Sequence, residues 1–385
     1  MEYENDGDLQ AIHDVVESNA DKLDSSFAKI LEQWLLKNCG ELNPEEKEAI
    51  AGIVENLCLD IAYNLEKSAN TIEIAITGLE TVLQLRPRET LSQEWAQTLH
   101  NLGDVYRNRI VGDKADNLEK AIACYQQALT VRKFDAFPED WAITQNNLGI
   151  AYHDRIKGEK AQNIEEAIAC YQQALKVSLI EAFPIDWAIT QSNLGNAYSD
   201  RIKGEKAQNI EEAIACYQQA LTVRTFEAFP IDWAVIQNLI GNAYLDRIKG
   251  EKAQNIEEAI ACYQQALTVR TFEAFPIDWA VIQNNLGIAY GDRIKGEKAQ
   301  NIEEAIACYQ QALTVRTFEA FPIDWSRTKN LIGNAYLDRI KGEKAQNSEE
   351  AIACYQQALT VRTFEAFPED WADTQNNLGN AYRNR

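Results

Sequence analysis

The feature that most constrains the fold of this chain is a tandem repeat with a period of 46 residues. Tryptophan recurs at this interval from Trp95 to Trp371, at Trp141, Trp187, Trp233, Trp279 and Trp325 in between. Residues 200–238 and 246–284 are identical. A fixed period of this size is typical of solenoids, in which each unit buries its apolar face only against its neighbours. The sequence therefore predicts a stack of similar units.

Each unit is predicted to contain two helices. The first is expected to start near Pro230, with Asp232 close to the positive end of the helix dipole, and to run to about Arg247. The second is expected to start at Asn209, whose side chain and that of Glu212 would form a capping box. The same Asn and Glu spacing recurs at Asn163 and Glu166, Asn255 and Glu258, Asn301 and Glu304, and Asn347 and Glu350. The predicted fold class is all-α.

The apolar positions of the second helix, such as Ala213, Tyr217 and Ala220, follow a spacing of three and four, which gives one apolar face. A glycine on the first helix lets the two helices approach closely. This glycine is expected to recur as a structural signature at Gly149, Gly195, Gly241, Gly287 and Gly333. One helix pair cannot cover both apolar faces, so the pairs are expected to stack.

These motifs resemble the tetratricopeptide repeat family. The first helix carries Leu-Gly-x-x-Tyr at 194–198, and the second carries Ala-x-x-x-Tyr-x-x-Ala at 213–220. The resemblance covers residues 95–385 and implies a superhelix of stacked antiparallel helix pairs whose concave groove binds a peptide or protein segment. The unit departs from the family because it exceeds the usual length of about 34 residues and holds Gln191 at the family's early tryptophan position. The pitch of the superhelix therefore does not carry over.

The expected organisation has three parts. Residues 1–42 are expected to form an N-terminal helical cap, 43–94 a degenerate first helix pair, and 95–385 the tandem units, the last of them incomplete. The expected helices before the tandem units lie near 7–18, 21–38, 45–66 and 71–86. The incomplete last unit is expected to reflect a piece of a longer protein.

Four positions of the first helix vary between units and share one stripe: three residues before the glycine, and one, four and five residues after it. In the resembled family this stripe lines the groove. The candidate peptide-binding residues are Asn146, Ile150, His153, Ser192, Asn196, Asn238, Asn242, Leu245, Asn284, Ile288, Asn330, Asn334 and Leu337. The asparagines three before the glycine form an amide ladder. Either it binds the main chain of a ligand, or its amides bond to adjacent helices and water.

A row of aspartates lies five residues after the glycine, and each is followed by an arginine. These pairs are interpreted as self-neutralising and solvated. The row consists of Asp154, Asp200, Asp246, Asp292 and Asp338. The cysteines that recur on the second helices are interpreted as small core residues in a reducing setting, since no spacing suits a disulfide or zinc site. The tryptophans are interpreted as packing residues.

Catalytic motifs are missing from the sequence. The three histidines, His13, His100 and His153, form no metalloprotease motif, and the sequence has neither a phosphate-binding loop nor a nucleophile elbow. We therefore expect a protein that is not an enzyme and has no catalytic residue, cofactor or metal.

The charge of the chain bears on its partners. Its formal net charge is −22, and residues 1–94 carry 20 acidic and 7 basic side chains, hence a net charge of −13. Such a chain repels phosphate backbones, so nucleic acid and anionic membranes are poor partners, and a neutral or basic protein or peptide fits better. The sequence shows no signal peptide or membrane-spanning stretch, which favours a cytoplasmic location.

Three functions remain open. The first is an interaction scaffold that binds a protein segment in its groove. The second is a sensor array, because the repeats look like those beside caspase-like peptidase or nucleotide-binding switch domains in large cyanobacterial proteins. The third is a structural solenoid, in which the incomplete C-terminal unit would stack end to end on another copy.

Overall fold

The structure of the chain, a computed structural model, describes residue 23 and residues 25–39, 42–65, 68–177 and 183–385, and it is all-α over these residues. The expected helix near 7–18 lies outside them. The sixteen described helices are α2 (Ser25–Asn38), α3 (Pro44–Tyr63), α4 (Ala69–Leu85), α5 (Ser92–Arg107), α6 (Lys114–Ala128), α7 (Pro138–Asp154), α8 (Lys160–Ala174), α9 (Pro184–Ser199), α10 (Lys206–Leu221), α11 (Pro230–Asp246), α12 (Lys252–Leu267), α13 (Pro276–Asp292), α14 (Lys298–Leu313), α15 (Pro322–Asp338), α16 (Lys344–Leu359) and α17 (Pro368–Asn384).

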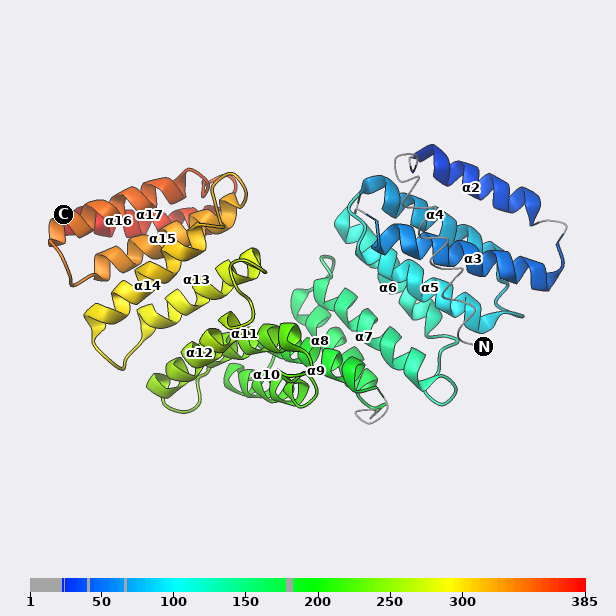
Figure 1. Ribbon diagram of the computed structural model, residues 1–385, viewed down its shortest axis with the longest axis horizontal. Helices are drawn as coiled ribbons and strands as arrows, with labels where there is room; N and C mark the ends of the chain where they lie inside the picture. Colours follow the sequence, from blue (N-terminus) through cyan, green and yellow to red (C-terminus); the bar gives the residue numbers. More distant parts are fainter. Residues whose placement is uncertain (1–22, 24, 40–41, 66–67, 178–182) are drawn as a thin grey trace. The chain divides into compact units, whose positions relative to one another are not determined.

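The helices pack as consecutive pairs within two compact units, Met1–Lys203 and Gly204–Arg385. In the first unit the pairs are α3 with α4, α5 with α6 and α7 with α8, and α9 packs on α8. In the second unit they are α11 with α12, α13 with α14 and α15 with α16, while α10 packs on α11 and α17 on α16. Within each unit the pairs follow one another in chain order (Figure 1). Each unit is therefore a helical repeat solenoid.

The first helices start where the sequence predicts. From α7 onward each has proline at its first position, preceded by a phenylalanine whose backbone leaves the helical region, as at Phe229 with φ −138° and ψ 61°. Proline suits this position because its missing N–H has no partner in a first helical turn anyway. Helix α11 ends at Asp246, one residue before the predicted end.

The predicted start of the second helices was wrong. Helix α12 begins at Lys252 after Glu251, and no side chain caps it. The predicted cap, Asn255, lies inside the first turn, where its Nδ2 donates to the carbonyl oxygens of Arg247 at 3.2 Å and Lys249 at 2.9 Å. The preceding loop turns at Gly250 with φ 81°, a conformation that favours glycine. The asparagine therefore holds the interhelical loop instead of capping the helix.

The core of each pair depends on the glycine of the first helix. A β-carbon on Gly241 would lie 2.6 Å from Cε1 of Tyr263, and one on Gly287 the same distance from Cε1 of Tyr309. Both tyrosines are buried. Only glycine therefore lets the tyrosine ring of the second helix lie against the backbone of the first.

The tryptophans and cysteines are packing residues. The Trp233 ring is partly buried and meets Phe226 edge to face, with ring centres 5.1 Å apart. All eight cysteines are buried and free, and burial raises the pKa of Cys262 to about 12. Such a thiol is a weak nucleophile at neutral pH.

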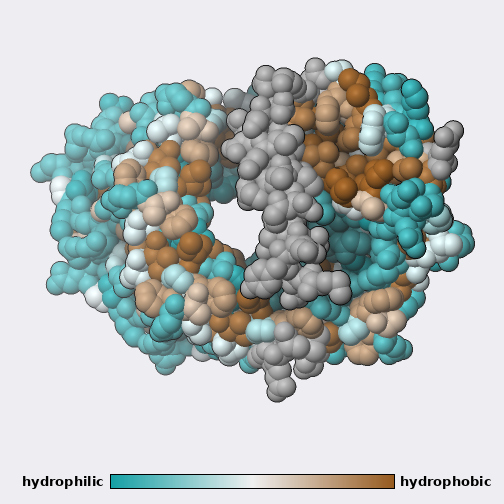
Figure 2. All heavy atoms as spheres, turned by 45° about the vertical axis from the view of Figure 1, so that its right-hand side comes forward, coloured by the Kyte–Doolittle hydropathy of each residue, from teal (hydrophilic) through white to brown (hydrophobic). Residues whose placement is uncertain are grey.

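On the face shown in Figure 2, most of the surface is hydrophilic, and apolar patches lie among the hydrophilic residues. Trp34 on α2 and Ile53 on α3 are among the exposed apolar residues. Of the helices that the structure describes, none combines the length and the apolar character needed to cross a bilayer.

Candidate functional site

The candidate binding stripe lies on helices that contact each other from repeat to repeat. Helix α7 contacts both α5 and α9, and α13 contacts both α11 and α15. No pair of successive second helices in the described part shows a comparable contact. The side of a curved stack on which equivalent helices approach most closely is its inner side. The first helices therefore form the inner side within each unit.

The amide ladder bonds between successive repeats. Oδ1 of Asn146 accepts from Nδ2 of Asn193 at 3.0 Å, and Oδ1 of Asn238 accepts from Nδ2 of Asn285 at 3.2 Å. Asn330 receives a longer bond of the same kind, and Oδ1 of Asn284 accepts from the Thr328 hydroxyl at 3.1 Å. Ser192 bonds only within its own helix, to the carbonyl oxygen of Ala188. The amide oxygens of the ladder thus accept hydrogen bonds that link neighbouring first helices.

The amide nitrogens of the ladder differ from its oxygens. Nδ2 of Asn146 donates to Asn147 at 3.1 Å. For Asn238 and Asn330, no acceptor within the described residues meets Nδ2, and both side chains are partly exposed. These two donors are available to a ligand.

In two units of the second half, the position after the glycine holds an asparagine that bonds to the second helix. Oδ1 of Asn242 accepts from the Tyr263 hydroxyl, and that of Asn334 from the Tyr355 hydroxyl, both at 2.7 Å. Asn196 also has an interaction partner. Asn242 and Asn334 therefore hold the tyrosine hydroxyls of their own helix pairs.

The apolar members of the stripe are partly buried. Ile288 packs against the core cluster around Tyr309, Leu245 against the one around Tyr263, and Leu337 against the one around Tyr355. Ile150 lines a pocket. Their side chains thus support the core and still expose apolar surface along the inner side.

His153 connects two repeats. Its Nε2 lies 3.0 Å from Oδ2 of Asp200, and its Nδ1 lies 3.6 Å from Oδ1 of Asp154. Hydrogen bonds to Asp154 and Asp200 raise the pKa of His153 to about 9, and burial opposes this only in part. The histidine is therefore protonated at neutral pH and shared by two carboxylates.

The expected pairing of each aspartate with the following arginine was wrong. The guanidinium of Arg293 is bound by Glu257, with Nε to Oε1 and Nη2 to Oε2 both at 2.8 Å. The same 36-residue spacing recurs at Arg109 with Glu73, Arg155 with Glu119, Arg201 with Glu165, Arg247 with Glu211, and Arg339 with Glu303. The planar guanidinium prefers a carboxylate that offers two oxygens in its plane, and the glutamate of the preceding second helix offers them.

The aspartates that do not pair with the following arginine lie on the surface. Asp246, Asp292 and Asp338 are exposed, and no basic side chain of the described residues pairs with them. The second unit thus carries three carboxylates without a basic partner among the described residues, one at the end of each of α11, α13 and α15.

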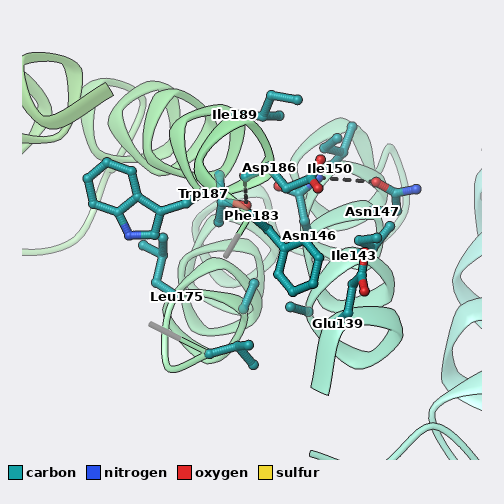
Figure 3. Close-up of a pocket in the computed structure, with 14 residues that line it drawn as sticks. Glu139, Ile143, Asn146, Asn147, Ile150, Leu175, Phe183, Asp186, Trp187 and Ile189 are labelled. Atoms are coloured by element: carbon teal, nitrogen blue, oxygen red, sulfur yellow. Dashed lines mark hydrogen bonds between the residues drawn. The ribbon is translucent and has the colours of Figure 1, made fainter. Parts of the chain in front are cut away.

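One further arginine row, located just after the second helices, was not predicted from the sequence motifs. Its members are largely buried, as Arg132 shows with a side chain that is 2% exposed. The row could have been found by comparing the repeats, because each complete unit but one carries arginine at this register. The unit without it contributes α8 to a pocket between α7, α8 and α9 (Figure 3).

The described residues contain no group of three or more His, Cys, Asp or Glu side chains that could hold a metal ion. The stripe instead offers amide donors, apolar surface and carboxylates, which suit the binding of a polypeptide.

Two repeat families match most of the array. The tetratricopeptide repeat model matches residues 95–131, 141–178 and 187–224. The Sel1 repeat model matches residues 237–268, 282–314 and 330–360. No curated protein sequence matches the chain.

The chain is similar to several solved structures at low sequence identity. A signal-transduction ATPase with a tetratricopeptide repeat sensor from Pyrococcus horikoshii is 14% identical, with a TM-score of 0.54 over 93% of this chain, which spans 52% of that protein's length. A tetratricopeptide repeat protein from Thermus thermophilus is 17% identical, with a TM-score of 0.39 over 63% of this chain and 98% of its own. The C-terminal part of a repeat protein from Cytophaga hutchinsonii is 10% identical, with a TM-score of 0.42 over 80% and 99%. With its matched repeats and helix-pair architecture, the chain is a repeat protein of the tetratricopeptide type.

Proposed function

We propose that this protein is a non-catalytic scaffold whose inner face of first helices binds a segment of a protein partner. The observation that carries the proposal is the combination found along α11, α13 and α15 in the second unit. Partly exposed apolar side chains at Leu245, Ile288 and Leu337 lie on the same helices as the free amide donors of Asn238 and Asn330. Apolar surface gives affinity, and amide donors bind main-chain carbonyls of any sequence.

The charge of this face favours a basic segment. The exposed carboxylates of Asp246, Asp292 and Asp338 follow the stripe at one position per repeat. A row of like charges attracts a partner with lysine or arginine at matching intervals and repels acidic partners. The net charge of −22 acts in the same direction.

Affinity capture from the native lysate with two matched double variants tests the proposal. L245E/I288E places two carboxylates on the stripe. A261E/A307E places two carboxylates at exposed positions of the second helices α12 and α14. We expect the partner to be lost from the first variant and retained by the second.

A charge reversal extends this test, because Leu245 and Ile288 also support the core. D246K/D292K/D338K changes only exposed side chains and should leave the helix content and melting temperature unchanged. We expect this variant to lose a basic partner as well. A partner that all three variants retain would overturn the proposal.

A second candidate is a sensor array within a larger switch protein. It is favoured by the fold shared with the signal-transduction ATPase, in which a tetratricopeptide repeat array is the sensor. The two candidates differ in what the captured protein or the complete reading frame contains. A nucleotide-binding domain on the same polypeptide would favour the sensor.

A further inference from the structure

One repeat departs from the others just after its second helix. It carries Ser178 at a register where the other units carry arginine, and Ile180 where the later units carry phenylalanine. The arginines at this register are Arg86, Arg132, Arg224, Arg270, Arg316 and Arg362. Position 178 lies outside the described residues, so its correspondence with these arginines comes from the sequence alone.

In the other units the arginine fills a site on the next first helix. Nη1 of Arg132 donates to Oγ1 of Thr144 at 2.9 Å, and its Nη2 lies 3.6 Å from Oδ1 of Asp140. Nη1 of Arg270 donates to Oδ2 of Asp278 at 2.6 Å.

A phenylalanine closes the site on one side. The guanidinium of Arg270 lies 4.4 Å from the centre of the Phe275 ring, within the range of a cation–π interaction. From Arg132 onward, the site for the arginine therefore includes an aspartate, a phenylalanine and, in some units, a threonine from the start of the next first helix. A group of the preceding first helix adds to it, such as Oε1 of Gln97 at Arg132 or the carbonyl oxygen of Ile231 at Arg270.

In the exceptional unit the same groups are present without the arginine. Phe183, Asp186 and Thr190 line a cavity of about 210 Å³ between α7, α8 and α9 (Figure 3). One water needs only about 10–15 Å³ of such space. Ile143 and Ile189 add an apolar wall. We call this cavity the vacant arginine socket.

The carboxylates of the socket meet no cation among the described residues. Asp186 is exposed, and no basic side chain within the described residues pairs with it. Glu139 lines the same cavity. Its equivalent one repeat earlier is the neutral Gln93, whose Nε2 donates to Asp140. The socket thus has one carboxylate more than the filled site before it.

The hydroxyl oxygen of Thr190 can accept a hydrogen bond. Its side chain is buried, and its hydroxyl donates to the carbonyl oxygen of Asp186 at 2.9 Å. Thr144 donates to its own helix in the same way while it accepts from Arg132. No donor within the described residues takes the corresponding place at Thr190.

We propose that the vacant arginine socket binds an arginine side chain of the protein partner. This inference rests on the proposed function and names one side chain that the partner would carry. A planar guanidinium suits the socket because it can bond to Asp186 and Thr190 together while its stem lies along the isoleucines. The two carboxylates repel an anion, and a neutral group forms weaker hydrogen bonds with Asp186 than a charged guanidinium does.

The test uses the full chain and two small probes, N-acetyl-arginine amide and its neutral isostere N-acetyl-citrulline amide. Binding is followed by NMR through the δ1-methyl groups of Ile143 and Ile189, which line the socket. We expect saturable shifts with the arginine probe and binding at least about tenfold weaker with citrulline, because a charged donor strengthens hydrogen bonds to a carboxylate.

Two variants and one control locate the binding. D186N removes the carboxylate, and S178R supplies the arginine found in the other units, so each should weaken arginine binding about tenfold or more. S178R should not lower the melting temperature, since it restores the residue of the other repeats. D278N removes the carboxylate of a site already filled by Arg270, so it should leave probe binding unchanged.

Two outcomes would overturn the inference: no saturable shift in the unmodified chain, or a shift that remains equally strong in both S178R and D186N. Neither outcome bears on the stripe variants. A partner lost from L245E/I288E but retained by S178R and D186N would leave the scaffold standing and remove the socket from it.

Discussion

At the residue scale, the glycine of the first helix determines how closely the tyrosine ring of the second helix can pack against the first. A β-carbon on Gly333 would lie 2.6 Å from Cε1 of Tyr355, whereas Gly379, at the same register one repeat later, has no atom within 4 Å. We predict that G333A destabilises the chain by about 1–3 kcal/mol through overpacking. G379A should instead be neutral or stabilise by up to about 1 kcal/mol, because alanine favours a helix over glycine. Urea unfolding followed by circular dichroism measures both, and equal effects would contradict this role of the glycine.

A second residue-scale prediction concerns His153. Its pKa of about 9 in the folded chain exceeds the ~6.5 of an unfolded histidine. Its protonated form therefore stabilises the fold fully below about pH 6.5, and this stabilisation is lost as the pH rises through about 9. We expect H153Q to be about 1–2 kcal/mol less stable than the unmodified chain near pH 6 and nearly equal to it near pH 10. A difference in stability that does not change with pH would contradict the ion pairs with Asp154 and Asp200.

Residue patterns predicted the close-approach glycines but not the role of the loop asparagines. Asparagine is common both as a helix cap and in loops, and the local spacing of Asn255 and Glu258 suits a capping box. The carbonyls that Asn255 binds belong to Arg247 and Lys249, in a loop whose path is not visible in the local pattern.

At the element scale, successive helix pairs are joined by glutamate–arginine pairs 36 residues apart. Glu257 on α12 and Arg293 after α13 are each about one quarter exposed and bond through both carboxylate oxygens. We predict that R293E costs about 1 kcal/mol or somewhat more, since it removes the pair and places two carboxylates together. The exchange E257R/R293E should recover about half of this loss or more.

A double-mutant cycle in urea measures this coupling. The exchange E211R/R247E in the preceding repeat is the matched control, because it has the same geometry. Additive losses in either cycle would show that the pair does not hold the helices together.

Helix order and pairing could be predicted because period, proline and apolar spacing agree within every repeat. The glutamate that binds the arginine after each first helix could not be predicted from the sequence. The adjacent aspartate is nearer in sequence, but the backbone after the first helix directs the guanidinium toward the preceding second helix. A fixed spacing of 36 residues was the only signal in the sequence.

At the scale of the whole molecule, comparing the near-identical units distinguishes residues needed for packing from residues that are candidates for binding. Residues that fill the core repeat, whereas the stripe and the vacant arginine socket vary. The departure at Ser178 is visible in the sequence, but only the structure shows that a cavity lies among Phe183, Asp186 and Thr190. The family resemblance predicted the solenoid, and we expect the choice of partner to depend on these few variable positions.

The most direct test of the scaffold is site-specific photo-cross-linking in the native lysate. A photoreactive amino acid replaces Ile288 on the stripe in one protein and the exposed Gln310 on α14 in another. We predict a cross-link to a lysine- or arginine-rich segment of one partner from position 288 and none from position 310. The same cross-linked proteins from both positions, or an acidic segment at 288, would contradict a scaffold that binds through its inner face.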